Sequence, residues 1–369
     1  MQTLLNQFVY FTFFQSLFLL GIYLFSKKNR KNINGYVAFL IFVLLLGLSG
    51  RVLYISEVFG KTHRLIAFSE FATLFFGSTV FLFTRSSLEN RRFSLKDLIH
   101  FIPGVLYILF IVGYYMLPSR EIIQEKVNSG ELFKVVTLII GISLIFNIGY
   151  WFFSLRYFLR FRENLKNELS YTVKTQFFLN FLMAIGLCLV VWLIIYFISI
   201  IGLPKIERQA RQFIWLGIAF IILFISYYKM IAPELFKIKQ VPVTKKYAQS
   251  KLSTSDLEKL KTQLEMLMQE KKPYLNNKLL KAELAEMLGL SNPELARLLN
   301  ESIGMNFFEY VNYYRIKEFV SLAQNNKYKN LTFYGLAQEA GFNSKTTFNK
   351  SFKKLMGTSP SEYFNKELQ

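Results

Sequence analysis

The chain has 369 residues, 53% of them hydrophobic, and carries a net charge of +20. This hydrophobic share, with 40 Phe and 21 Tyr, is too high for an ordinary soluble protein of this length. The single cysteine, Cys188, excludes an intrachain disulfide and a metal site built from several cysteines. It is expected to be a small buried hydrophobic residue. The basic excess suits phosphate backbones or anionic lipid headgroups, and alone it does not choose between them.

Seven apolar segments in the first 230 residues are predicted to cross a membrane as helices. A helix needs about 20 apolar residues to span the hydrocarbon core, and apolar runs that are continuous rather than alternating favour helices over a β-barrel. The segments are Leu4–Phe25, Gly35–Ile55, Leu65–Phe83, Leu98–Leu117, Val135–Leu155, Phe177–Ile201 and Phe213–Tyr228. They predict a polytopic seven-helix bundle over residues 1–232.

The connectors between these segments predict the orientation of the bundle, because Lys and Arg collect on the cytoplasmic side. The first, third and fifth connectors are strongly basic, with Lys27, Lys28, Arg30, Lys31, Arg85, Arg91, Arg92, Lys96, Arg156, Arg160, Arg162, Lys166 and Lys174. The second and fourth hold few basic residues or balance them with acids, and the sixth is short. We therefore expect the N-terminus outside and the C-terminus in the cytoplasm. The first segment lacks a basic stretch before it and a small-residue cleavage pattern, so it is expected to be a retained anchor.

Polar side chains inside the predicted spans are costly there and are candidates for function. Arg51 and Glu70 lie near the external ends of the second and third spans, at similar depths for a rise of about 1.5 Å per residue. Gln15, Asn147 and Asn180 are also within spans. Arg51 and Glu70 could belong to an outward-facing ligand pocket. The alternative is a structural ion pair, or side chains that extend to the membrane surface.

The segment after the last span predicts a flexible cytoplasmic exit from the membrane over residues 233–254, which are polar and charged. Residues 255–275 are expected to form an amphipathic helix, capped by Ser255 and Glu258. Its apolar stripe consists of Leu257, Leu260, Leu264 and Leu267. The stripe is explained either by packing against the neighbouring domain or by a homodimer through residues 255–270.

A motif of two short helices and a tight turn occurs twice in the C-terminal part. Leu284-Ala285, three further residues and Gly289-Leu290 recur as Leu336-Ala337, three further residues and Gly341-Phe342. Glycine suits the positive φ of the turn, and the small alanine allows the two helices to cross closely. Each copy therefore shows the pattern of a helix-turn-helix.

A longer helix is predicted between the two copies, from Phe307 to about Gln324, with Asn306 as its N-cap. At roughly 27 Å, this helix could hold the two recognition helices about one DNA turn, near 34 Å, apart. Ser291 with Glu294 is expected to cap the second helix of the first copy. The segment that begins at Ser359 is expected to start a short closing helix.

Residues from about 264 to 366 resemble the DNA-binding domain of AraC/XylS-type transcription regulators. The matching stretches are Lys272–Leu275, Leu284–Asn300, Asn306-Phe307, Tyr310–Ile316, Gly341–Ser344, Phe348–Lys354 and Gly357–Tyr363. The resemblance implies an all-α fold, with an AraC-type domain of two helix-turn-helix units over residues 276–366. The whole arrangement is similar to bacterial regulators whose sensor is a multi-pass membrane domain.

The resemblance implies two recognition helices that contact double-stranded DNA. The contact residues expected in this sequence are Asn292, Pro293, Glu294, Ala296, Arg297, Asn300, Asn343, Ser344, Lys345, Thr346, Thr347, Asn349, Lys350, Lys353 and Lys354. Arg297 and Lys350 can donate hydrogen bonds to guanine, and Thr346 and Thr347 can contact a thymine methyl group. Asn343, Ser344, Lys353 and Lys354 suit phosphates.

The first recognition helix departs from the family pattern. Pro293 and Ala296 occupy positions where larger contacting side chains are common, so this helix is expected to read fewer bases. In the second helix, Lys350 stands where Arg is common, and lysine lacks the two-pronged donor geometry of a guanidinium group.

The sequence therefore predicts a sequence-specific DNA-binding transcription regulator in a bacterial inner membrane, whose bundle senses a small-molecule or membrane signal. The partners would be double-stranded DNA, the lipid bilayer and that signal. An enzyme is not expected, because the sequence shows no catalytic, cofactor or metal-ligand motif and its two histidines, His63 and His100, are isolated. The alternative is a transporter-like or tethering membrane domain, with regulation by proteolytic release of the DNA-binding domain.

Overall fold

The computed structural model describes residues 2–25, 35–58, 63–89, 91, 93–173, 175–203, 206, 210–231, 254–325 and 330–367. Within these residues the regular structure is helical, apart from one isolated antiparallel bridge between Leu169 and Leu280. The all-α fold class predicted from the sequence is therefore confirmed.

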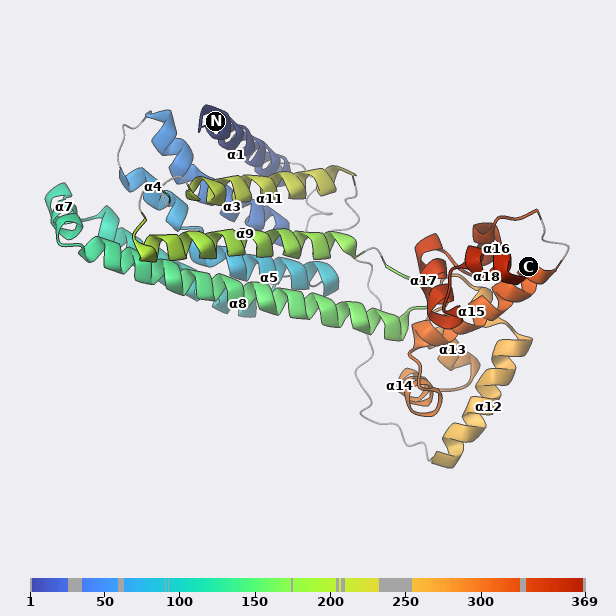
Figure 1. Cartoon of the computed structure of the whole chain (residues 1–369). Helices are drawn as coiled ribbons and strands as arrows, with labels where there is room; N and C mark the ends of the chain where they lie inside the picture. The colour runs from blue at the N-terminus through green and yellow to red at the C-terminus, as the bar shows by residue number, and fades with distance from the viewer. Residues whose placement is uncertain are drawn as a thin grey trace. The chain divides into compact units, whose positions relative to one another are not determined.

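The chain divides into two compact units, whose order along the sequence is visible in Figure 1. The N-terminal unit comprises Met1–Leu159 and Thr175–Gln240, and the C-terminal unit comprises Arg160–Lys174 and Val241–Gln369. The C-terminal unit thus includes a connector between two predicted spans, which the sequence did not lead us to expect. The predicted linker, residues 233–254, lies outside the described residues except for Thr254.

The N-terminal unit is built from helices because each continuous apolar run can pair its backbone amides within its own segment only as a helix. Its elements are α1 (Gln2–Phe25), α3 (Gly35–Ser56), α4 (His63–Glu70), α5 (Thr73–Glu89), η1 (Leu95–Phe101), α6 (Ile102–Ile111), η2 (Val112–Met116), α7 (Arg120–Asn128), α8 (Glu131–Glu168), α9 (Gln176–Ile201) and α11 (Gln212–Ile231). The last residues of α8 belong to the C-terminal unit.

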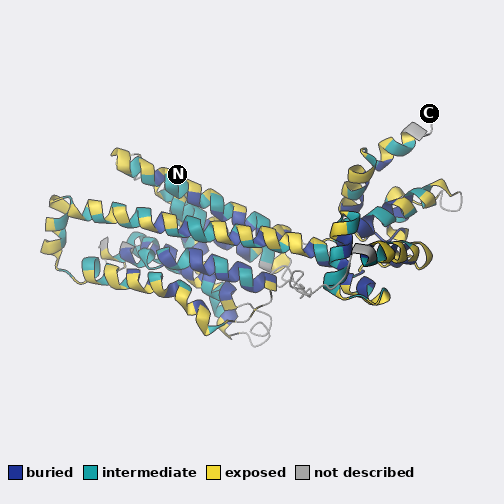
Figure 2. Ribbon diagram, turned by 90° about the horizontal axis from the view of Figure 1, so that it is seen from below, coloured by how far each residue is buried: buried dark blue, intermediate teal, exposed yellow. Residues whose placement is uncertain are grey.

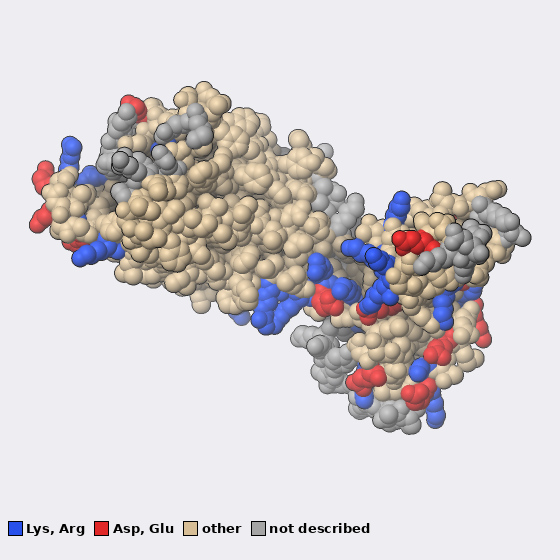
Figure 3. All heavy atoms as spheres, viewed as in Figure 1, with Lys and Arg blue, Asp and Glu red and all other residues tan. Residues whose placement is uncertain are grey.

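Six stretches of the described residues are helical, long and apolar enough to cross a membrane, and the shorter apolar helix Gln212–Tyr228 corresponds to the seventh predicted span. The surface of the unit agrees with a membrane environment. Many large apolar side chains are exposed, among them Phe18, Leu138, Ile145 and Leu187, and Figure 2 shows exposed residues along the outer faces of these helices. On the face drawn in Figure 3, the charged side chains of this unit lie toward its ends.

The third predicted span, Leu65–Phe83, differs from the single helix expected. It is interrupted at Phe71 and Ala72, between α4 and α5. Just beyond the interruption, the buried amide of Asn147 donates to the Thr73 carbonyl oxygen (3.0 Å) and accepts from the Gly77 amide (2.8 Å). Asn147 therefore takes the place of a helix hydrogen bond between residues four apart, which lowers the cost of the irregular backbone.

The C-terminal unit contains nine described helical elements besides the end of α8. They are α12 (Thr254–Glu270), η4 (Pro273–Leu275), α13 (Lys281–Met287), α14 (Asn292–Arg297), η5 (Leu298–Ile303), α15 (Phe307–Gln324), α16 (Phe333–Glu339), α17 (Lys345–Met356) and α18 (Pro360–Glu367). The long central helix α15 has the predicted limits. Its predicted cap is also present, since the Asn306 side chain accepts from the Glu309 amide at 2.9 Å.

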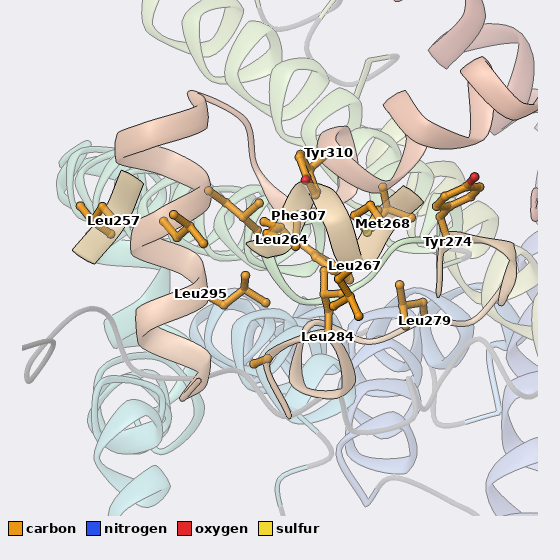
Figure 4. Close-up of a cluster of buried hydrophobic side chains, with 14 residues drawn as sticks. Leu257, Leu264, Leu267, Met268, Tyr274, Leu279, Leu284, Leu295, Phe307 and Tyr310 are labelled. Carbon is orange, nitrogen blue, oxygen red and sulfur yellow. The ribbon is translucent and has the colours of Figure 1, made fainter. Parts of the chain in front are cut away.

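Two hydrophobic cores lie along α15, one for each predicted helix-turn-helix unit. The first joins α12, α13, α14 and η5 to the start of α15 through residues such as Leu264, Leu284, Leu295 and Phe307 (Figure 4). The second packs α16 and α17 against the later part of α15 around Phe319. The leucines Leu257, Leu264 and Leu267 of α12 are buried in the first core, as the packing alternative predicted, so that stripe is not an exposed face for a second copy.

Candidate DNA-binding interface and membrane-domain cavity

The first helix-turn-helix unit consists of α13 and the segment α14–η5. Gly289 forms the turn with a φ of +67°. The helix that follows begins after Ser291, whose backbone amide and hydroxyl both donate to the Glu294 carboxylate, at 2.9 and 2.7 Å. These bonds hold the pKa of Glu294 below its usual value. A charged carboxylate at a helix N-terminus is favourable, so the start of this recognition helix is well defined.

The second helix-turn-helix unit repeats this construction with α16 and α17. Gly341 forms the turn with a φ of +91°, and the hydroxyl of Ser344 accepts from the Thr347 amide at 3.4 Å. Phe342, Phe348 and Phe352 are buried on one side of the unit. The opposite side of α17 is therefore the polar face that remains for a partner.

Most of the predicted contact residues on the second recognition helix are accessible. Asn343, Lys345, Thr346, Asn349, Lys350, Lys353 and Lys354 are exposed, and Ser344 is half-buried. Thr347, which was expected to contact a thymine methyl group, is not accessible. Its side chain is buried, and its hydroxyl lies 2.9 Å from the hydroxyl of Thr172 in the connector. Among the four lysines of this surface, Lys354 is ion-paired with Glu309 of α15.

The first recognition helix offers less accessible side-chain surface. Asn300 is exposed, whereas Asn292, Pro293, Glu294, Ala296 and Arg297 are half-buried. The guanidinium of Arg297 pairs with Glu301 one turn later, at 2.8 Å. Arg297 must therefore leave or share this carboxylate to donate to a base, an exchange that an exposed ion pair makes at small cost.

Arg315 is a central residue of the C-terminal unit that the sequence did not single out. It is only 1% exposed and donates hydrogen bonds to the carbonyl oxygens of Tyr274 (2.8 Å), Asn276 (2.8 Å) and Ser170 (2.6 Å). Burial lowers the pKa of Arg315 to about 9, which leaves it charged at neutral pH. This role depends on Tyr274, Asn276 and Ser170, which are distant in the sequence, so nothing in the sequence indicated it.

The N-terminal unit contains a cavity of about 260 Å³ beside the break between α4 and α5. Its lining is mostly apolar and aromatic, with Trp192, Tyr196 and Trp215 among the larger side chains. Glu70, the last residue of α4, also lines it, and its Oε2 atom accepts from the hydroxyl of Tyr107 at 3.1 Å. A mostly apolar cavity with a few polar groups is typical of a small-molecule site.

The two residues predicted for a ligand pocket occupy different places relative to this cavity. Glu70 lines the cavity, and Arg51 is not among its lining residues. Arg51 donates to the Asn6 side chain at 3.2 Å and lies over the ring of Trp215, 4.8 Å from the ring centroid. Since Trp215 lines the cavity, Arg51 contacts the site through that ring. Arg211, Trp192 and Trp215 also line the cavity. They were not predicted, because they lie at the ends or on the faces of spans where one sequence shows no distinguishing pattern.

Comparison with known proteins identifies the class of the C-terminal unit. A helix-turn-helix domain family matches residues 284–366, which include the second unit and all of the first except the first three residues of α13. This chain therefore carries an AraC-type helix-turn-helix domain, the DNA-binding domain of a class of transcription regulators, as the resemblance in the sequence implied. Among curated proteins, the Msm operon regulatory protein of Streptococcus mutans is 32% identical over 87 residues. The match covers 24% of this chain and 30% of that protein, so the chain spans less than a third of the relative's length. No solved structure matches the chain significantly.

Proposed function

We propose that this chain is a membrane-bound transcription regulator whose N-terminal unit receives a signal and whose C-terminal unit binds specific DNA sequences. The AraC-type domain at residues 284–366 supports the DNA-binding part. The apolar helices of the N-terminal unit support a membrane location. With the basic connectors on the inner side, the N-terminus lies outside a bacterial inner membrane and the C-terminal unit lies in the cytoplasm, where it can reach DNA.

The cavity beside Glu70 is the observation that supports a sensing role for the membrane unit. Irregular backbone within a membrane is tolerated where it is buried in protein or lines a cavity, and the break between α4 and α5 places Glu70 in this wall. Both described hydrogen bonds to this carboxylate, from Tyr107 and Thr73, reach Oε2. A bound molecule can then pair with Oε1 while its apolar part contacts the tryptophans. A ligand that prefers one packing of these helices would shift the population of that packing.

Mapping the DNA bound by the full-length protein in cells tests the DNA-binding part. We expect discrete bound sites, each with a pair of half-sites about one helical turn apart. A matched comparison is provided by Lys350→Ala, on the exposed face of α17, and Lys271→Ala, which removes the same charge from an exposed position beyond α12. Sites that persist in the Lys271 variant and weaken in the Lys350 variant would support the assignment.

Replacing Arg297 or Lys350 with alanine is expected to weaken binding to such a site by about 1–3 kcal/mol, because each loses a donor to a base edge. The measurement is a titration of an operator fragment with purified protein, with the footprint recorded for each variant. If both variants produced the wild-type footprint at the wild-type affinity, the recognition helices would be wrongly assigned.

Replacing Glu70 with glutamine, or Arg51 with alanine, is expected to abolish the response of a target promoter while membrane insertion stays normal. Glu70→Gln replaces the carboxyl group in the cavity wall with an amide that cannot ionise, and Arg51→Ala removes the cation that lies over Trp215. The measurement is reporter output across growth conditions in which the wild-type output varies, with the amount of protein in the membrane fraction as a check. Glu131→Gln, at an exposed pair with Tyr114, is the control. Variants that respond as the wild type does would argue against a sensing site at this cavity.

Proteolytic release of the C-terminal unit remains the alternative mode of regulation. It would produce a soluble fragment that begins near residues 237–255, detectable with an antibody against the C-terminus. Promoter control by an uncleaved full-length chain would instead support signalling through the bundle.

A further inference from the structure

A buried ion pair at the end of α8 fixes the connector within the C-terminal unit. Glu168, the last residue of α8, accepts from the Nζ atom of Lys281 at 2.7 Å. The side chains of Glu168 and Lys281 are 6% and 3% exposed, so both charges are almost completely shielded from solvent. A buried ion pair is costly to break from one side, because the remaining charge loses its compensation. The start of α13 therefore holds the end of α8 tightly.

A second set of contacts surrounds Ser170, two residues further along. Its hydroxyl donates to the Leu279 carbonyl oxygen at 2.8 Å, and its backbone amide donates to the same oxygen at 3.3 Å. Arg315 donates to the carbonyl oxygen of Ser170 at 2.6 Å and to its hydroxyl at 3.1 Å. The adjacent Leu169 forms the isolated bridge with Leu280 and is completely buried. The connector thus supplies acceptors to a buried guanidinium and pairs with the segment that leads into α13.

The connector also reaches the second helix-turn-helix unit. Thr172 lies 2.9 Å, oxygen to oxygen, from Thr347 in the first turn of α17. The neighbouring Lys345 and Thr346 are exposed and belong to the expected DNA contacts. The short segment Glu168–Thr172 therefore touches the start of α13, the central helix α15 and the recognition helix α17.

The same helix that ends in the connector also lines the cavity of the membrane unit. Thr137 and Ile140, near the start of α8, belong to the cavity lining. The helix continues without interruption to Glu168, about 42 Å further along its axis at 1.5 Å per residue. An α-helix transmits a shift or rotation along its length better than a flexible segment does, because each turn is fixed by hydrogen bonds to the next.

We infer that the segment Glu168–Thr172 is a built-in part of the DNA-binding unit and is the element through which the membrane unit controls DNA binding. The surface formed by Lys281, Leu279 and Arg315 is an interaction site for this segment of the same chain. That this segment is part of the DNA-binding unit follows from the contacts alone. That it controls DNA binding rests on the proposed function. One consequence concerns cleavage in residues 237–253. It would separate the DNA-binding domain covalently from Glu168–Thr172, the segment that neutralises Lys281 and supplies acceptors to Arg315.

Disulfide cross-linking tests the seating of the connector in the full-length chain. Thr172→Cys with Thr347→Cys, in a Cys188→Ser background, should form a disulfide on mild oxidation in isolated membranes, because the two hydroxyls are in contact. The disulfide is detected by cleavage at a protease site introduced in residues 237–253. The two fragments stay together on a non-reducing gel only if the bond has formed. Thr172→Cys with Asn349→Cys, whose side chain is exposed on another face of α17, is the control pair. Equal cross-linking of both pairs, or of neither, would overturn the seated arrangement.

Removal of the ion pair tests whether DNA binding depends on the seated connector. We expect Lys281→Met to weaken binding of the full-length protein to an operator fragment at least about tenfold, because the buried carboxylate of Glu168 loses the compensating charge of Lys281. Glu168→Leu combined with Lys281→Met should recover most of that loss, since both charges are gone. Lys278→Met removes a charge of the same sign from an exposed position three residues earlier and should have little effect. A Lys281 variant that matches the Lys278 variant, or a double variant no better than the single one, would refute this dependence.

Interruption of α8 tests whether the membrane unit controls DNA binding through this helix. Arg162, Glu163 and Asn164 are exposed in α8 and can be replaced together by glycine or together by alanine. The glycine variant breaks the stiffness of the helix, whereas the alanine variant keeps it. We expect the glycine variant to keep the Thr172–Thr347 cross-link and the operator affinity but to lose the promoter response, and the alanine variant to keep all three. A glycine variant that responds normally would refute transmission through α8, whereas a wild-type protein that occupies no DNA would refute the proposed function and leave the cross-linking result valid.

Discussion

Replacing Arg315 with methionine is expected to destabilise the C-terminal unit by more than about 3 kcal/mol. The guanidinium donates to the carbonyl oxygens of Tyr274, Asn276 and Ser170, and each buried acceptor that loses its donor costs about 1–3 kcal/mol. The full loss approaches the whole stability of an ordinary domain, which is about 5–15 kcal/mol. Arg315→Lys should be intermediate, because an ammonium group keeps the charge but cannot reach several acceptors in fixed directions.

Hydrogen exchange of the full-length protein in lipid nanodiscs measures this effect. In the Arg315 variants, amide protection should fall strongly in α15 and α16. It should also fall in the connector around Ser170. Lys317→Met is the control, since Lys317 is exposed on the same helix and its described contact is with the Tyr313 ring, worth at most about 1 kcal/mol. Equal protection in the Arg315→Met and Lys317→Met variants would show that the buried hydrogen bonds contribute little.

The parts of the fold that follow a local rule were predicted well from the sequence. Asn306 and the limits of α15 were correct because a cap and an apolar pattern are both local signals. The repeated Leu-Ala and Gly pattern located both helix-turn-helix units, since a tight turn with positive φ restricts the residue type. The break in the third span was not predicted, because it is supported by Asn147 from a distant helix.

The exposure of the candidate contact residues could be predicted from the sequence only where the position of a side chain on its own helix decides it. The exposed lysines of α17 face away from the buried phenylalanines by helical periodicity, and so they could be assigned. Thr347 was assigned wrongly, because a residue more than a hundred positions earlier in the chain covers it. Glu168 and Lys281 showed no signal for the same reason. Each is an ordinary charged residue near a helix end until the fold brings the two together.

The two turn glycines are expected to differ sharply in their tolerance of alanine, although they occupy equivalent positions in the repeat. Gly289 and Gly341 both have positive φ, so alanine at either position costs about 1–2 kcal/mol of backbone strain. A Cβ atom at Gly289 would meet nothing within 4 Å, whereas one at Gly341 would lie 2.3 Å from the Tyr274 carbonyl oxygen. That oxygen also accepts from Arg315, so it cannot move without weakening the same network.

Gly341→Ala should therefore destabilise the C-terminal unit by about 2–5 kcal/mol, since overpacking of about 1–3 kcal/mol adds to the strain. Gly289→Ala should cost only the strain. Because the clash displaces the backbone that holds Arg315, Gly341→Ala should also lower the efficiency of the Thr172–Thr347 cross-link, and Gly289→Ala should not. The measurement is hydrogen exchange together with that cross-link in the full-length chain. Equal losses of stability and of cross-linking in the two variants would mean that the turn of the second helix-turn-helix unit is not packed against Tyr274. The close association of the two helix-turn-helix units along α15 would then have to be reconsidered.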